Sequence, residues 1–272
     1  MISLVDMNEN LSGKVNVSLI VPVFDEEKSI QKFLSDIINF DYFDEIICVN
    51  DGSGDRSLEV LKSFDDNINL INLEINQGKG KALAEGVRTA KNDTILFLDA
   101  DLYDLNLPDI QIMVDPVLKE GYDYIIGYWH ELSMLIFKKL SGQRVYHRSD
   151  LMPLISKMER SRYGVEVLLN DAFKDKKGKY VYFNKVKHLE KFDKFSMIDS
   201  YSRFIQEGVE IALELGKKEV FSIEDIRLLN KIREVRSVKE VITLVKTIKN
   251  KRIRELLEDY FKKYLYYVIP RK

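Results

Sequence analysis

The chain reads TILFLDAD from Thr94 to Asp101. Its central positions form a continuous apolar run, which is typical of a strand buried on both faces of a parallel sheet. Two carboxylates follow at once, at Asp99 and Asp101. In an extended segment, residues two apart point to the same side, and two neighbouring carboxylates repel each other unless a cation or a proton lies between them. The segment therefore predicts a buried strand that ends at a site for Mg²⁺ or Mn²⁺, since carboxylates and substrate phosphates commonly share these ions.

Short apolar runs alternate with amphipathic segments on both sides of this strand. This alternation predicts an α/β fold with a mostly parallel sheet flanked by helices, and ligands bind beyond the carboxyl ends of the strands in such sheets. The expected strands are 15–24, 45–49, 68–74, 94–98, 123–127 and 179–187, with an extended segment at 143–148; the expected helices are 26–40, 55–64, 81–91, 149–157 and 163–173.

A polar loop follows each of the first four expected strands, at residues 22–27, 50–55, 76–81 and 99–101. Asn, Asp and Gly occur in ordinary turns for backbone reasons alone, so a single loop of this kind would indicate little. All four loops, however, fall at the same edge of the predicted sheet. Their coincidence favours a nucleotide site at this edge. The loop with Lys79 is not a P-loop, because the required glycine spacing and the Ser or Thr after the lysine are missing.

Together these motifs resemble the GT-A glycosyltransferases of family 2, a family typified by polyprenyl-phosphate sugar synthases and glucosyl-3-phosphoglycerate synthases. The resemblance runs from about Val15 to about Lys191. The matching motifs are VPVFDEE (21–27), VNDGS (49–53), GKG (78–80), the DXD motif DAD (99–101), SGQR (141–144) and YGVE (163–166).

The resemblance implies a role for each of several residues. Pro22, Phe24 and Glu26 would line the nucleoside pocket, with Glu26 accepting hydrogen bonds from the ribose or the base. Asp51 would hold the edge of the base; the family often has Asp where this chain has Asn50. Lys79 would approach the diphosphate or the donor sugar, and Asp99 would contact the ribose or the sugar. Asp101 and His188 would bind the metal ion.

Two further residues are candidates for catalysis. Arg144, with Arg148, could grip a phosphate through planar bidentate contacts, and the alternative is a basic surface strand. Glu166 would contact the donor sugar or the acceptor hydroxyl, or else cap a helix. A phosphate acceptor is already ionised at neutral pH and would need no general base, whereas a sugar hydroxyl would need one.

The predicted function is metal-dependent transfer of a hexose from a nucleotide diphosphate sugar to a phosphate-bearing acceptor. UDP-glucose is favoured as the donor over GDP-mannose. Two acceptors stay open, a polyprenyl phosphate and a small phosphorylated acid such as phosphoglycerate. A nucleotidyltransferase is the enzymatic alternative, and a module that binds lipid or RNA through basic helices is the non-enzymatic one.

Composition sets the remaining expectations. The chain has 272 residues, of which 45% are hydrophobic, and a formal net charge of −2, which argues against a protein that mainly coats nucleic acid. Cys48 is the single cysteine and lies in an apolar run, so no internal disulfide can form. The first 13 residues lack the pattern of a signal peptide, and no apolar run is long enough to span a bilayer. These features predict a cytoplasmic protein, at most peripheral to a membrane.

Two domains are expected, a catalytic domain over residues 1–194 and a helical region over residues 195–272. Residues 217–272 contain 16 Lys and Arg against 8 Asp and Glu, interleaved with apolar positions. One interpretation packs these helices on the core or against the partner subunit of a homodimer. The other rests residues 246–272 on an anionic membrane surface, where basic and aromatic side chains meet the lipid headgroups.

Overall fold

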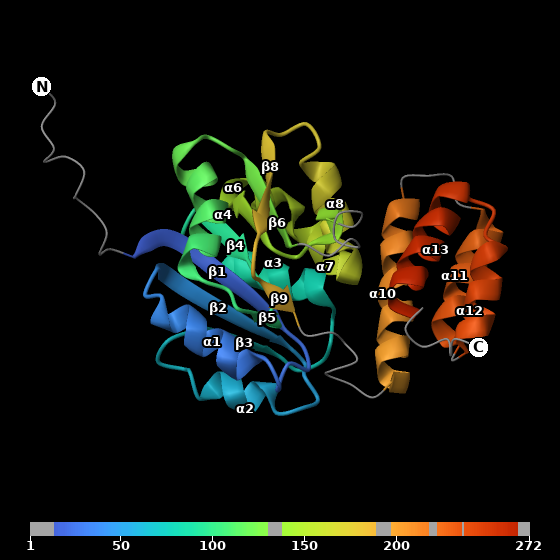
Figure 1. Ribbon diagram of the computed structural model, residues 1–272, viewed down its shortest axis with the longest axis horizontal. Helices are drawn as coiled ribbons and strands as arrows, with labels where there is room; N and C mark the ends of the chain where they lie inside the picture. Colours follow the sequence, from blue (N-terminus) through green and yellow to red (C-terminus); the bar gives the residue numbers. More distant parts are fainter. Residues whose placement is uncertain (1–13, 130–137, 189–196, 218–221, 236, 266–272) are drawn as a thin grey trace, which may run out of the picture.

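The computed structural model describes residues 14–129, 138–188, 197–217, 222–235 and 237–265. Within these residues, a seven-stranded sheet has the order β3-β2-β1-β4-β7-β6-β8, and every strand except β7 runs in the same direction (Figure 1). The mostly parallel sheet predicted from the sequence is confirmed. Its strands are β1 (Val15–Val23), β2 (Phe43–Asp51), β3 (Asn69–Leu73), β4 (Thr94–Phe97), β6 (Tyr124–Trp129), β7 (Arg144–His147) and β8 (Gly178–Phe183).

Helices cover both faces of the sheet, because neighbouring strand residues point to opposite faces. Leu19 and Val21 of β1 belong to a core shared with helices α1, α2 and α4. Ile20 packs on the other face, in a second core shared with helices α3, α7 and α8. The helices are α1 (Ile30–Asn39), α2 (Ser57–Lys62), α3 (Lys79–Thr89), α4 (Leu107–Lys119), α6 (Arg148–Leu151), α7 (Ile155–Ser161) and α8 (Val165–Ala172), with 3₁₀ turns η1 (Lys138–Leu140), η2 (Met152–Leu154) and η3 (Arg162–Gly164).

Several elements differ from the sequence expectation. Helix α1 begins at Ile30 and not at residue 26, because the backbone N–H groups of Glu26 and Glu27 donate to the side chains of Ser57, at the start of α2, and of Asp55 in the loop before it. Helix α4 was not expected; a capping box of Asn106 and Asp109 starts it. Strand β5 (Leu102–Tyr103) pairs antiparallel with β9 (Lys187–His188) in a small second sheet.

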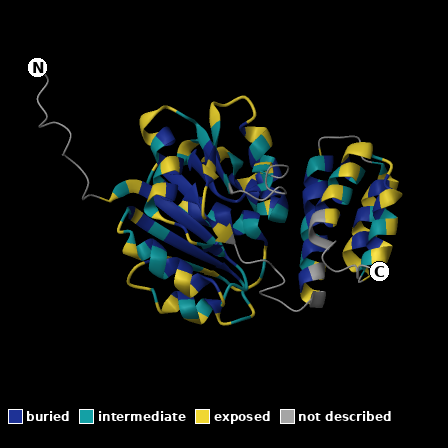
Figure 2. Ribbon diagram, in the orientation of Figure 1, coloured by how far each residue is buried: buried dark blue, intermediate teal, exposed yellow. Residues whose placement is uncertain are grey.

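The last helices are α10 (Met197–Gly216), α11 (Ile223–Glu234), α12 (Val238–Lys246) and α13 (Lys251–Leu265). They form a bundle beside the sheet with its own apolar core, which Val167 of α8 joins (Figures 1 and 2). The expected helical extension is therefore confirmed. The expected domain boundary at residues 194–195 lies outside the described residues. None of the helices in the described segments is long and apolar enough to cross a membrane.

Candidate functional site

The loops that follow β1, β2 and β4 meet at the carboxyl edge of the sheet, as predicted. The antiparallel direction of β7 adds a fourth segment to this edge. Its first residue, Arg144, pairs with Phe97 at the end of β4, so residues 141–143 lie beside Asp99. The N-terminus of α3, with Lys79, completes the edge.

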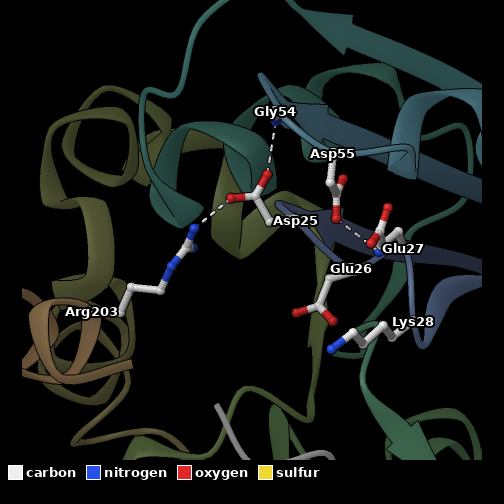
Figure 3. Close-up of a pocket in the computed structure, with 7 residues that line it drawn as sticks. All are labelled: Asp25, Glu26, Glu27, Lys28, Gly54, Asp55 and Arg203. Carbon is white, nitrogen blue, oxygen red and sulfur yellow. Dashed lines mark hydrogen bonds and ion pairs between the residues drawn. The ribbon is translucent and has the colours of Figure 1, made fainter. Parts of the chain in front are cut away.

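The loops after β1 and β2 are joined by hydrogen bonds from backbone to side chain. The N–H of Asp25 donates to Ser53 Oγ at 3.1 Å, and the N–H of Gly54 donates back to Asp25 Oδ1 at 2.8 Å. Asp25 adopts a φ of 55°, a left-handed conformation that Asp tolerates better than most residues. A pocket of about 240 Å³ lies between the two loops and α10 (Figure 3). Its lining residues are Asp25, Glu26, Glu27, Lys28, Gly54, Asp55 and Arg203.

The three residues expected in the nucleoside pocket lie at the end of β1. Pro22 pairs with Val49 in the sheet register, and the Phe24 ring lies beneath the Arg203 guanidinium at 5.1 Å from the ring centroid. Glu26 lines the pocket of Figure 3, and its Oε2 accepts a hydrogen bond from the Ser29 hydroxyl at 2.6 Å. Because all three are only partly buried, they are accessible from this edge.

Asp51 holds a neighbouring loop in place. Its carboxylate is 2% exposed and accepts the backbone N–H groups of Gln77 and Gly78, both at 2.8 Å. Burial raises the pKa of Asp51, and the two N–H donors and Arg162 oppose that shift. Gly78 has a φ of 96°, and a β-carbon there would lie 2.9 Å from the Cα of Arg162. The contact of Asp51 with a base edge stays a prediction, whereas its hydrogen bonds to the lysine loop are direct.

Lys79 lies between two of the predicted site residues. Its Nζ is 2.7 Å from Asp99 Oδ1 and 2.8 Å from Glu166 Oε1. Burial disfavours the charged amine, but the two carboxylates outweigh this effect, so the pKa of Lys79 is raised above that of an ordinary lysine. Lys79 therefore stays protonated and links the end of β4 to α8.

The backbone at Gly142 lies directly against this ion-paired cluster. A β-carbon at this position would overlap Asp99 Oδ2 and Lys79 Nζ, so only glycine fits without displacing them. The adjacent Gln143 is buried and donates its Nε2 to Asp99 Oδ2 at 3.2 Å. Residues 142 and 143 thus help to fix the Asp99 carboxylate beside Lys79.

Arg144 does not have the free guanidinium that phosphate binding would require. It is 1% exposed and donates from Nε to Ser141 O and from Nη2 to Lys139 O. Its Nη1 donates to Tyr146 Oη at 2.9 Å and to Asn170 Oδ1 at 3.0 Å. These bonds use most of the donors of a guanidinium. The structure therefore corrects the prediction for Arg144, which holds β7 to η1 and α8.

The prediction that Arg148 binds a phosphate is wrong for a different reason, which is the place of Arg148 relative to the sheet. The preceding residue, His147, pairs with Thr94 at the start of β4, so Arg148 lies at the edge of the sheet opposite the candidate site. Its guanidinium donates to the carbonyl oxygens of Val87 and Arg88 at the end of α3. Arg148 thus caps a helix C-terminus and does not face a ligand at the carboxyl edge.

The predicted metal ligands lie close together along the chain's small second sheet: Asp101 directly precedes β5, and His188 is the last residue of β9. Residues 100–101 form a turn after β4, which corrects the extended geometry expected there. In the β5–β9 pairing, Leu102 is the partner of His188, so the backbones of positions 101 and 188 are close. The His188 side chain lies outside the described residues. Within the part of the chain that is described, no three or more His, Cys, Asp or Glu side chains gather as a metal-binding group.

Two residues at this edge were missed by the sequence reasoning, and both come from α10. Arg203 donates to Asp25 Oδ2 at 2.5 Å, although the two residues are 178 positions apart (Figure 3). Glu210 accepts from Arg162 Nε and from the backbone N–H of Tyr163, both at 3.1 Å. No local motif marks either residue. A charged side chain on the mostly apolar face of an amphipathic helix would have been the only signal.

Comparison with known proteins gives three kinds of match. Residues 18–139 match the family model of glycosyl transferase family 2. Among curated proteins, poly-beta-1,6-N-acetyl-D-glucosamine synthase of Staphylococcus epidermidis is 35% identical over 88 residues, which are 31% of this chain and 21% of that protein. A dolichyl-phosphate beta-glucosyltransferase of Trichomonas vaginalis is 36% identical over 101 residues, covering 33% of this chain and 31% of the relative.

A third relative is the undecaprenyl-phosphate 4-deoxy-4-formamido-L-arabinose transferase of Pectobacterium atrosepticum, with 31% identity over 138 residues, 48% of this chain and 42% of that protein. The chain therefore spans less than half the length of each of these curated relatives.

One of the matching solved structures is glucosyl-3-phosphoglycerate synthase from Mycobacterium tuberculosis. In its complex with Mn²⁺, UDP-glucose and glycerol 3-phosphate, that enzyme superposes with a TM-score of 0.57 at 19% identity, over 74% of this chain and 80% of the other. At this identity the likeness shows the fold alone. The resemblance predicted from the sequence is thus confirmed: residues 18–139 match glycosyl transferase family 2, and the chain has the GT-A fold of glucosyl-3-phosphoglycerate synthase.

Proposed function

We propose that the protein transfers a hexose from a nucleotide diphosphate sugar to a phosphate-bearing acceptor. The observation that carries this proposal is the convergence of Lys79, Asp99 and Glu166 at the carboxyl edge of the sheet, beside the pocket at the end of β1. Three of the residues implied by the family resemblance meet there within hydrogen-bond distance. The family match over residues 18–139 supports the same reaction class.

UDP-glucose is the favoured donor. Pro22, Phe24 and Glu26 would bind the nucleoside, with ribose hydroxyls donating to Glu26, and Asp51 would fix the loop that carries Lys79. Crystal structures with the same fold contain UDP-glucose or UDP, which supports a uridine nucleotide. GDP-mannose is the alternative donor that the test below includes.

Asp101 and His188 would hold Mg²⁺ or Mn²⁺. A carboxylate suits Mg²⁺ or Mn²⁺, and the β5–β9 register brings the position of His188 next to that of Asp101. A divalent ion at this place would neutralise charge on the leaving diphosphate. Asp99 is ion-paired with Lys79, which leaves it better suited to contact the ribose or the donor sugar than to bind the metal. The enzyme of the same fold was crystallised with Mn²⁺ and with Mg²⁺, which supports a divalent ion.

The acceptor is proposed to be a phosphate, on a small acid such as phosphoglycerate or on a polyprenyl chain. Glu166 is 7% exposed and paired with Lys79, so it is poorly placed to accept a proton from an acceptor hydroxyl. An acceptor phosphate needs no such base, because it is already ionised. Contact of the C-terminal segment with a membrane, formation of a homodimer and a cytoplasmic location stay predictions.

Product analysis tests the proposal. The protein is incubated with Mn²⁺ and UDP-glucose or GDP-mannose, together with 3-phosphoglycerate or a short polyprenyl phosphate. Release of the nucleoside diphosphate with glycosylation of one acceptor is the expected result. Release of pyrophosphate would identify a nucleotidyltransferase instead. No turnover of any donor with either acceptor would contradict the proposal.

A further inference from the structure

Helix α10 presents charged side chains to the candidate site from one of its faces. Arg203 and Glu210 are seven residues apart, which places them two turns apart on the same side of the helix. Both contact segments of the sheet domain that carry or support predicted donor-binding residues. The contacts differ in burial, because Arg203 is 28% exposed at its side chain and Glu210 only 5%.

The first contact joins α10 to the pocket at the end of β1. The Arg203 guanidinium donates to Asp25 Oδ2 (Figure 3). It also lies over the Phe24 ring, so it contacts two consecutive residues of the loop. Asp25 Oδ1 accepts the N–H of Gly54 in the second loop. A single carboxylate therefore connects α10 with the loops after β1 and β2.

The second contact joins α10 to the lysine loop through Arg162. The Glu210 carboxylate accepts hydrogen bonds from Arg162 Nε and from the backbone N–H of Tyr163. Arg233 of α11 donates to the same carboxylate at 3.1 Å. Arg162 has a φ of 49°, a left-handed conformation that is uncommon for residues other than glycine and that its surroundings must stabilise.

Arg162 in turn supports the segment that positions Lys79. Its Nη2 donates to Asn76 Oδ1 at 3.2 Å, and its Cα lies so close to Gly78 that a β-carbon on that residue would be only 2.9 Å away. Gly78 precedes Lys79 and donates its N–H to Asp51. Displacement of Arg162 would therefore displace the start of α3.

We propose that α10 positions the donor-binding loops through two ionic contacts, Arg203 with Asp25 and Glu210 with Arg162. Arg203 and Glu210 are positioning residues: Glu210 acts through Arg162, and Arg203, which also lines the pocket, holds Asp25 in place. The C-terminal helices are then a required part of the donor site and not a separate module. This inference rests on the proposed function, because it concerns binding of the donor nucleotide.

The test compares substitutions on α10 with a matched control on the same helix. Arg203→Gln removes the ion pair with Asp25, and Glu210→Gln removes the negative charge that pairs with Arg162 and Arg233. Glu214→Gln is the control: Glu214 lies one turn beyond Glu210, is equally buried at 6% exposure, and pairs with Lys217 just beyond the end of the helix. The readouts are the Kd of UDP with Mn²⁺ by calorimetry, the KM and kcat for UDP-glucose, and the thermal unfolding temperature.

Arg203→Gln and Glu210→Gln are expected to raise the Kd of UDP and the KM of UDP-glucose about tenfold, with a smaller change in kcat. Glu214→Gln is expected to leave both constants within about twofold of the wild type. In an Asp25→Asn background, Arg203→Gln should have little further effect, because both changes remove the same contact.

Unchanged UDP binding in folded Arg203→Gln and Glu210→Gln, with only a lower unfolding temperature, would overturn the inference and leave the proposed function intact. If the wild type neither binds UDP with Mn²⁺ nor transfers from any donor, the proposed function fails and the inference fails with it. Should Glu210→Gln not fold, Arg203→Gln decides, because the Arg203 side chain is more exposed than that of Glu210 and its removal is less disruptive to the fold.

Discussion

The loop at residues 78–81 and the segment at residues 142–148 each contain a glycine followed by basic side chains, yet these side chains have different partners in the structure. Lys79 pairs with two side-chain carboxylates at the carboxyl edge. Arg144 and Arg148 donate largely to backbone carbonyls, and Arg148 lies at the opposite edge of the sheet. A basic residue near glycine therefore does not by itself indicate a ligand site, because backbone carbonyls can use its donors.

This contrast predicts that mutations at the carboxyl edge reduce activity without unfolding the protein. Asp101→Ala has the largest expected effect: transfer from UDP-glucose should be abolished, and UDP binding should lose its dependence on Mn²⁺. The unfolding temperature should stay close to that of the wild type, because Asp101 is only partly buried and lies in a turn. Initial rates with Mn²⁺ and with excess chelator provide the measurement, and full activity of the variant would remove Asp101 from the metal site.

Substitution of Arg144, in contrast to that of Asp101, should reduce the stability of the fold. Arg144→Ala leaves several buried acceptors without donors, and we expect it to lower the free energy of unfolding by about 3–5 kcal/mol. Urea denaturation measures this loss. If the variant keeps wild-type stability but needs far more acceptor for half-maximal rate, the phosphate-binding role predicted from the sequence would be restored.

Lys79→Ala should mainly affect catalysis. Loss of a charged hydrogen bond to the donor would raise the activation free energy by about 1.5–3 kcal/mol, which lowers kcat/KM roughly 10- to 150-fold. Steady-state kinetics with varied UDP-glucose measure this change, with Lys81→Ala as the control, because Lys81 pairs with Glu85 and Glu159 away from Asp99. Equal effects of the two substitutions would mean that Lys79 has no special role.

The ion pairs of Lys79 also predict a pH dependence of stability. A raised lysine pKa contributes stability that is fully present below the unfolded pKa of about 10.4 and is lost as pH rises through the higher folded pKa. The difference in unfolding free energy between the wild type and Lys79→Met should therefore be constant from about pH 6 to about pH 9. A difference that shrinks within this range would show that the amine loses its proton earlier than the structure implies.

Arg148→Ala should have the smallest effect. Its two hydrogen bonds cap the end of α3 at a partly exposed position, so a loss of about 0.5–1.5 kcal/mol in unfolding free energy is expected. Transfer activity should be unchanged. A selective rise in the KM of the acceptor would instead place Arg148 at a ligand site and weaken the contrast between the two segments.

The sheet and the place of the site could be predicted because both depend on local patterns. The apolar run at residues 95–98 and its neighbours identify the strands, and the rule of the carboxyl edge is enough to place Asp99 and Lys79 at the same edge of the sheet. The role of Arg144 could not be predicted in this way. Its acceptors include the Asn170 side chain, which reaches Arg144 only when α8 packs on the sheet.

The contribution of α10 was beyond sequence reasoning for a similar reason. Arg203 meets Asp25 only after the whole sheet domain has folded, and the pattern of α10 indicates an amphipathic helix without saying which surface it covers. Helix α4 was missed for a local reason, since its sequence contains Pro108 and Pro116, and proline usually argues against a helix. Pro108 lies in the first turn, where proline is tolerated, and Pro116 lies in the last turn of the helix.

Thermal unfolding with UDP tests most directly whether the carboxyl edge is a metal-dependent nucleotide site. At a ligand concentration of about 100 times the Kd, binding should stabilise the fold by about 2.7 kcal/mol. We predict a rise in the unfolding temperature that requires Mn²⁺ or Mg²⁺, is reversed by a chelator and is absent in Asp101→Ala. The same rise with chelator present, or no rise with UDP or GDP and either metal, would contradict the account.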